Sequence, residues 1–187
     1  IEDCAHAIES KYNGVPCGTN NYAGCFSFYG TKNITTACGE GGMLLSKHPR
    51  VIEFARKMSL HGMSKNAADR YSDSGFKLYD ILEPGYKYNM PDVSAAFALS
   101  QLSRIEYNRS IRESIWDRYN EAFEDLSIFT PFDIPIEDRH AYHLYTIQLG
   151  SPRFKASRDH ILNALTKEGI GVGVHYPAIH TLSWYKD

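Results

Sequence analysis

Apolar residues recur with helical spacing most clearly over residues 49–61. Val51 and Phe54 fall on one face of a helix there. Pro49 suits the first turn, because its missing N–H needs no partner at that position. Gly62 follows the last turn, where glycine commonly ends a helix. The pattern therefore predicts an amphipathic helix over this segment.

Four other segments carry weaker helical signals. The first opens with acidic residues, which suit a helix N-terminus. The last opens with Ser157, a preferred N-cap, and ends at Gly169. The helices predicted from these signals cover residues 2–10, 91–106, 108–126 and 157–169.

Alternating and short apolar runs predict four strands, which lie at residues 23–29, 43–46, 141–149 and 170–176. Few apolar positions repeat over residues 63–82, so this segment is predicted to be a long surface excursion. The chain therefore mixes helices and strands, which is typical of an α/β protein.

The pattern changes after a link that contains Pro131 and Pro135. The strand, helix and strand predicted beyond it form a compact α/β unit. We therefore expect two domains, residues 1–107 and 108–187, with the boundary inside the helical region.

Composition narrows the class of protein. The 187 residues can bury a core, and a net charge of -2 argues against nucleic acid or an acidic membrane surface as the main partner. No apolar run approaches the roughly 20 residues that span a bilayer. The four cysteines all fall within the first 38 residues and form no CxxC pair, so we expect reduced thiols in a soluble, cytoplasmic protein.

Lys32 is the first candidate for chemistry. It lies between an aromatic strand and a glycine-rich run, where lysines are unusual. A buried lysine loses its charge more easily, so its amine can act as a nucleophile and form a Schiff base. Taken alone, however, a lysine is usually a solvated surface charge, and the residue pattern leaves both interpretations open.

Three neighbours of this segment are weaker candidates. Asp3 lies where a strand ends and a helix is predicted to begin, a place where α/β proteins bind ligands but also where aspartate caps a helix. His6 would share a helical face with Asp3, or lie on the helix surface. Ser27 alternates with two phenylalanines, as a small residue on the polar face of a strand also would.

The His140–His143 pair suggests a metal site only superficially. Positions three apart on a strand point to opposite faces, so the two imidazoles would not reach one ion. No metal site is predicted.

Five motifs occur in an order that resembles the DegT/DnrJ/EryC1/StrS family of pyridoxal phosphate (PLP) enzymes; they are EDCAHA, GCFSFYGTKN, GEGGM, PGYKYNMPDVSAAFALSQL and GIGVGVHYPAIH. The resemblance covers the whole chain and is closest to members that form 4-amino sugars. It implies the PLP-dependent transferase fold of type I, the aspartate-aminotransferase-like fold. Here it would comprise a C-terminal part of the large domain and the small C-terminal domain. The phosphate-binding turn and the ring-stacking aromatic would lie upstream.

The resemblance also assigns roles around the cofactor. Lys32 matches the lysine that holds PLP and shuttles a proton, and Asp3 matches the aspartate that pairs with the pyridinium nitrogen. His6 takes the place of a His or Gln beside the ring, and Ser27 matches a serine that binds the phosphate.

The GYKYN segment differs from the GYNYR of other members, which reaches the phosphate of the partner subunit. Asn89 is favoured for this contact and Lys87 is the alternative. His175 and Tyr176 match a motif near the nucleotide-sugar.

The resemblance implies amino transfer, with L-glutamate as donor, to a keto sugar of a nucleotide-sugar in surface polysaccharide or lipopolysaccharide biosynthesis. It also implies a homodimer. The alternative is a truncated, non-catalytic relative that serves as a binding or interaction domain.

Overall fold

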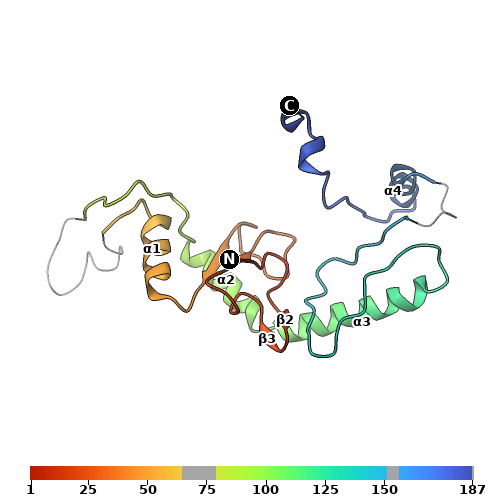
Figure 1. Ribbon diagram of the computed structural model, residues 1–187, viewed down its shortest axis with the longest axis horizontal. Helices are drawn as coiled ribbons and strands as arrows, with labels where there is room; N and C mark the ends of the chain where they lie inside the picture. The colour runs from red at the N-terminus through yellow and green to blue at the C-terminus, as the bar shows by residue number, and fades with distance from the viewer. Residues whose placement is uncertain (65–78, 151–155, 187) are drawn as a thin grey trace. The chain divides into compact units, whose positions relative to one another are not determined.

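The computed structural model describes residues 1–64, 79–150 and 156–186 (Figure 1). Its contacts divide the chain into two compact units, one of residues 1–121 and 132–145 and the other of residues 122–131 and 146–187. The described elements are β1 (Glu2–Asp3), β2 (Lys11–Tyr12), β3 (Val15–Pro16), β4 (Gly24–Ser27), β5 (Gly42–Leu45), α1 (Pro49–Ser59), α2 (Asp92–Leu102), α3 (Ile105–Phe123), α4 (Arg158–Lys167), η2 (Ile179–Thr181) and η3 (Ser183–Tyr185).

The first unit is built on a three-stranded sheet in the order β1-β4-β5. β1 pairs with β4 in parallel, with Asp3 opposite Cys25, and β5 returns antiparallel to β4. The strands predicted at 23–29 and 43–46 are thus confirmed in shorter form. Because β1 and β4 are parallel, their carboxyl ends lie at the same edge of the sheet.

The helix predicted over residues 2–10 is wrong. Glu2 and Asp3 form β1, and turns follow it. The Glu2 carboxylate, taken as a helix signal, instead accepts backbone N–H groups of Gly18 at 2.7 Å and of Asn21 at 2.8 Å. The Glu2 carboxylate therefore stabilises the turn that contains Gly18 and Asn21, and it does not begin a helix.

A hairpin that the sequence analysis did not assign follows β1. Strands β2 and β3 pair antiparallel around Asn13 and Gly14, which both have positive φ. Asn-Gly is the usual pair in such a two-residue turn. Lys11 of this hairpin also exchanges backbone hydrogen bonds with Arg139, at 2.9 and 3.0 Å.

The helical predictions after residue 48 are confirmed with small shifts in their bounds. Helix α1 ends near Gly62, which has a φ of +70°. In α2, Ser94 and Ala98 are buried, whereas Val93 is 70% exposed. Most of the excursion predicted over residues 63–82 lies outside the described residues.

The core of the first unit is small. Phe28 of the segment after β4, Ile34 and Ala98 of α2 are buried together, and Ile8, Phe26, Met90 and Ile105 pack around them. The segment that carries Lys32 therefore lies against the core on one side.

The strand predicted over residues 141–149 does not form within the described part of the chain. The carbonyl of Ala141 accepts the Asn33 amide at 3.1 Å and the Arg112 guanidinium at 3.1 Å, and Tyr142 has a φ of +50°. Side chains thus satisfy a backbone that a neighbouring strand would otherwise pair with. Trp116 of α3 packs edge-on against Tyr142 and Tyr145 beside it.

In the second unit, the predicted helix is confirmed as α4. The Ser157 side chain accepts the backbone N–H of His160 at 3.2 Å, and Gly169 follows the helix with a φ of +77°. The strand predicted over residues 170–176 is wrong, since these residues show no strand pairing with any described segment.

The boundary expected near residue 107 falls inside the first compact unit. The reason is that α3 is continuous across it and holds the 140–145 segment through Arg109, Arg112 and Trp116. Across the ranges that the structure describes, no helix is both long and apolar enough to cross a bilayer.

Candidate functional site

Lys32 lies in the connection between β4 and β5. Backbone hydrogen bonds close this loop at its base, from Phe28 N–H to Gly41 O at 2.8 Å and from Gly30 N–H to Gly39 O at 2.9 Å. The N–H of Lys32 donates to Tyr29 O at 2.9 Å. The lysine is therefore held on a short turn that begins directly after the sheet edge, and its side chain is partly buried.

The Lys32 amine contacts the imidazole of His6. Nζ of Lys32 lies within hydrogen-bond distance of Nε2 of His6, which comes from the turn after β1. Whenever the amine donates in this contact, Nε2 of His6 is the acceptor. The two residues meet because the parallel pairing of β1 and β4 ends both strands at one edge.

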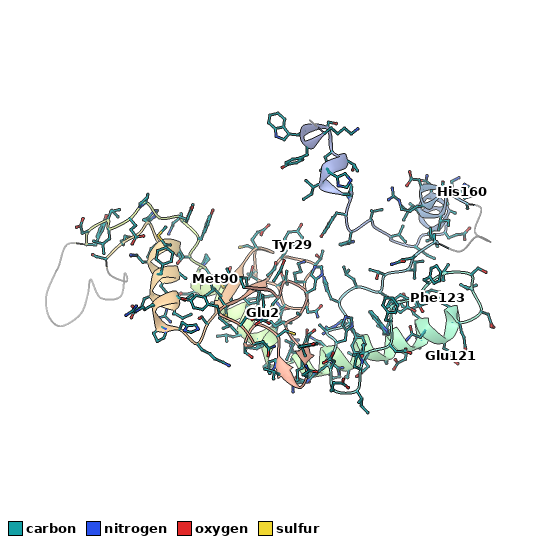
Figure 2. The ribbon with its side chains drawn as sticks, viewed as in Figure 1. Glu2, Tyr29, Met90, Glu121, Phe123 and His160 are labelled. Atoms are coloured by element: carbon teal, nitrogen blue, oxygen red, sulfur yellow. The ribbon has the colours of Figure 1, made fainter. Side chains whose placement is uncertain are left out.

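Asp3 and Ser27 are placed at that same edge. Asp3 ends β1 and is exposed, with Oδ1 accepting the N–H of Ala5 at 3.1 Å. Ser27 ends β4 and is half-buried. Glu2 of β1 and Tyr29, which follows β4, are labelled in the same part of the first unit (Figure 2).

Three residues that the sequence analysis did not select support this pair. Asn33 bonds the buried Glu9 and also His143, and the His143 ring lies against the ring of His6. Asn33 was visible only as a neighbour of Lys32, and His143 only as a possible metal ligand. No local signal marks Glu9, because its partners come from distant segments.

Lys87 and Asn89 lie on one side of their extended segment. The Lys87 amine donates to Oδ1 of Asn89 at 2.6 Å. Asn89 also lines a groove of about 980 Å³ between β5, α1 and residues 88–91. Both residues are exposed, and Asn89 is the one that lines the groove.

His175 and Tyr176 belong to the second unit. Their rings are in contact, with centroids 4.7 Å apart, and Tyr176 is 72% exposed. The side chain of Tyr176 is thus largely accessible to solvent.

The two histidines of the HxxH pair have different partners. His140 packs edge-on against Trp116, and burial together with the charge of Arg109 lowers the pKa of its imidazole. His143 bonds Asn33. Among the described residues, no group of three or more His, Cys, Asp or Glu side chains is arranged to hold a metal ion.

The side chains at the sheet edge supply an amine, an imidazole, a carboxylate and a hydroxyl. An amine condenses with an aldehyde, a carboxylate pairs with a protonated ring nitrogen, and a hydroxyl donates to phosphate oxygen. This donor set fits PLP, the cofactor that the sequence motifs imply.

Comparison with known proteins gives the same indication. The model of the DegT/DnrJ/EryC1/StrS aminotransferase family matches residues 1–187. The spore coat polysaccharide biosynthesis protein SpsC of Bacillus subtilis is 40% identical over 188 residues, which is 100% of this chain and 48% of SpsC. The uncharacterized protein MJ1066 of Methanocaldococcus jannaschii is 42% identical over 187 residues, which is 100% of this chain and 48% of MJ1066. The chain thus spans about half the length of the curated relatives it matches.

Solved structures are similar over nearly all of the chain. PseC of Helicobacter pylori, an aminotransferase of pseudoaminic acid biosynthesis, has a TM-score of 0.85 at 30% identity, covering 98% of this chain and 47% of PseC. The PLP form of Spr1654 from Streptococcus pneumoniae has a TM-score of 0.81 at 32% identity, covering 98% of this chain and 45% of Spr1654. The PMP form of Spr1654 has a TM-score of 0.84 at 34% identity, covering 98% of this chain and 47% of Spr1654.

Proposed function

The chain belongs to the DegT/DnrJ/EryC1/StrS aminotransferase family, and from this premise we propose that the whole protein is a PLP-dependent sugar aminotransferase. The fold of its relatives is the type I PLP-dependent transferase fold, of which this mixed α/β chain forms part. We propose that Lys32 binds the cofactor.

The observation that carries the proposal is the contact between Lys32 Nζ and His6 Nε2 at the carboxyl ends of β1 and β4. Ligands of α/β proteins gather at such strand ends. An imidazole that accepts from the amine orients it, and the carboxylate of Asp3 lies at the end of the adjacent strand. A surface lysine without function would have no need of this arrangement.

Four residues of the chain have separate roles in this chemistry. PLP, when bound, withdraws electrons from the carbon of an attached amine, so that a proton on that carbon becomes labile. Lys32 takes up and returns this proton through Nζ. Asp3 holds a proton on the ring nitrogen, and His6 orients the Lys32 amine. The hydroxyl of Ser27 donates to the phosphate.

The finer assignments belong to the same proposal. L-glutamate is the amino donor, and the acceptor is a keto sugar of a nucleotide-sugar for surface polysaccharide or lipopolysaccharide biosynthesis. Their support is the family and the spore coat polysaccharide relative. Asn89, with Lys87 as the alternative, binds the phosphate of the partner in a cytoplasmic homodimer. His175 and Tyr176 bind the nucleotide-sugar. Residues 1–107 would belong to the large domain and 108–187 to the small one.

Replacing Lys32 tests the proposal. The full-length protein should be yellow with bound PLP, and borohydride should attach the cofactor to Lys32, as peptide mass mapping would show. Lys32→Ala should lose this covalent attachment and the transfer of amino groups from glutamate to a keto-sugar nucleotide, because the amine that contacts His6 is removed. Lys47→Ala, which removes an exposed lysine after β5, is the matched control and should retain both.

A wild-type protein that folds but takes up no PLP would contradict the proposal. It would favour the alternative of a non-catalytic relative that binds a partner without turnover.

A further inference from the structure

The Lys32–His6 pair is connected to a buried carboxylate that has no part in the proposed chemistry. The Glu9 side chain is 1% exposed, and its Oε1 receives a hydrogen bond from Nη2 of Arg112. Its Oε2 accepts Nδ2 of Asn33 at 2.8 Å. A buried carboxylate is tolerated only when it is paired and hydrogen-bonded, and here both oxygens are. Glu9 is therefore a fixed acceptor at the base of the site.

Glu9 determines how the amide of Asn33 is oriented. Nδ2 of Asn33 donates to Glu9 and also to the carbonyl of Ala141, at 3.1 Å. Both acceptors lack a proton to give, so the nitrogen of the amide must face them. The oxygen Oδ1 is then left facing His143. A flipped amide would place its oxygen against two other oxygens.

Asn33 in turn determines the tautomer of His143. Oδ1 of Asn33 lies 2.8 Å from Nδ1 of His143, and an amide oxygen only accepts hydrogen bonds. Nδ1 of His143 must therefore carry a proton. When the imidazole of His143 is neutral, it is thus the Nδ1–H tautomer. This N–H donates to Asn33, whose amide is oriented by its hydrogen bond to Glu9.

The network reaches Lys32 by two routes. Asn33 is the next residue in the chain, so its three hydrogen bonds hold the turn that carries Lys32. The ring centroids of His143 and His6 lie 4.3 Å apart, with an angle of 54° between the ring planes. His6 in turn contacts the Lys32 amine. We propose that Asn33 and His143 are positioning residues, through which Glu9 fixes the imidazole and the amine of the site. The inference rests on the proposed role of Lys32.

The first test reads the tautomer directly. The full-length protein is labelled with nitrogen-15 histidine and studied by NMR without added cofactor, and the His143 signal is identified by its loss in His143→Gln. The wild type should carry its His143 proton on Nδ1. Asn33→Leu should lose this preference, because no acceptor then remains opposite Nδ1–H. A wild-type proton on Nε2, or an unchanged tautomer in Asn33→Leu, would overturn the proposal.

The second test follows the amine. The rate at which Lys32 attaches to added PLP, seen as visible absorbance, should fall roughly tenfold or more in Asn33→Leu and in His143→Leu, since a hydrogen bond or ring that orients the pair is lost. Turnover should fall with little change in KM for the sugar substrate. Asn120→Leu is the control, because Asn120 accepts the hydroxyl of Tyr145 at 2.8 Å and touches neither Lys32 nor His6 in the described contacts.

The two experiments separate the failures. If the wild type attaches no PLP, the proposed function fails, while the tautomer still reports on the network. If the wild type attaches PLP and Asn33→Leu and His143→Leu attach it as fast, the positioning role is overturned and the proposed function stands.

Discussion

At the scale of single residues, some functional groups could be identified from the sequence and others could not. Lys32 was found because its flanking aromatic strand and glycines are local in sequence. Glu9 and His143 were not identified, because their roles depend on distant partners. Glu9 bonds Arg112, 103 residues away, and His143 bonds Asn33, 110 residues away. A side chain whose meaning depends on a distant hydrogen-bond partner leaves no periodic or spacing signal.

Glu2 shows the same effect and makes a prediction. The backbone N–H of Gly18, with those of Asn21 and Asn20, holds the pKa of Glu2 below its ordinary value of 4.5, although burial opposes this. A lowered pKa in the folded state means that the stabilisation is present above pH 4.5 and is lost as the pH falls through the folded-state value.

Glu2→Gln should therefore lower the stability at neutral pH and reduce its loss on acidification, as urea unfolding at a series of pH values would show. Glu121→Gln, at an exposed position of α3, is the control and should leave the pH dependence as in the wild type (Figure 2). Parallel pH curves for Glu2→Gln and the wild type would contradict the assignment.

At the scale of elements, helices could be predicted from the sequence better than strands. The signals that mark α1 and α4 are local: Pro49 begins α1, and Ser157 directly before α4 caps it. A strand needs a partner, and residues 141–149 and 170–176 have strand-like patterns without forming strands in the described structure. The hairpin at Asn13 and Gly14 carried a local turn signal and could have been assigned from it.

The packing of β4 against the turn at Gly18 depends on a glycine. A Cβ atom at Gly24 would lie 2.3 Å from Cα of Gly18, which is backbone and has no rotamer to change. Gly24→Ala should therefore destabilise the protein by about 3 kcal/mol in urea unfolding, since overpacking would force the backbone apart.

Gly30→Ala is the matched control for this change. Its added Cβ would have its nearest neighbour 3.9 Å away, so the cost should stay within about 0.5 kcal/mol. Equal destabilisation by the two substitutions would show that the close contact between Gly24 and Gly18 does not determine the loss of stability.

At the scale of the whole molecule, the described chain leaves much apolar surface uncovered. Val93 and Leu99 of α2 are 70% and 66% exposed, and Met43 of β5 is 51% exposed. Its relatives are about twice as long. An exposed apolar surface of this kind marks an interface or a tendency to aggregate.

We therefore expect the 187 residues expressed alone to bind a hydrophobic dye such as ANS strongly and to self-associate. The full-length protein should bind it weakly, because the rest of the chain would cover α2 and β5. Val93→Ser combined with Leu99→Ser should reduce dye binding of the isolated chain. Equal fluorescence from the isolated chain and the full-length protein would contradict this expectation.

The closed base of the Lys32 loop bears on how the loop can change during evolution. Ile34 and Thr36 are buried, whereas Ala37 and Cys38, in the turn that leads back to Gly39, are exposed. Insertions at this exposed turn would extend outward and leave the amine in register with β1. Insertions between Phe28 and Ile34 would rotate it away, so length variation among descendants of this sequence should accumulate on the far side of Thr36.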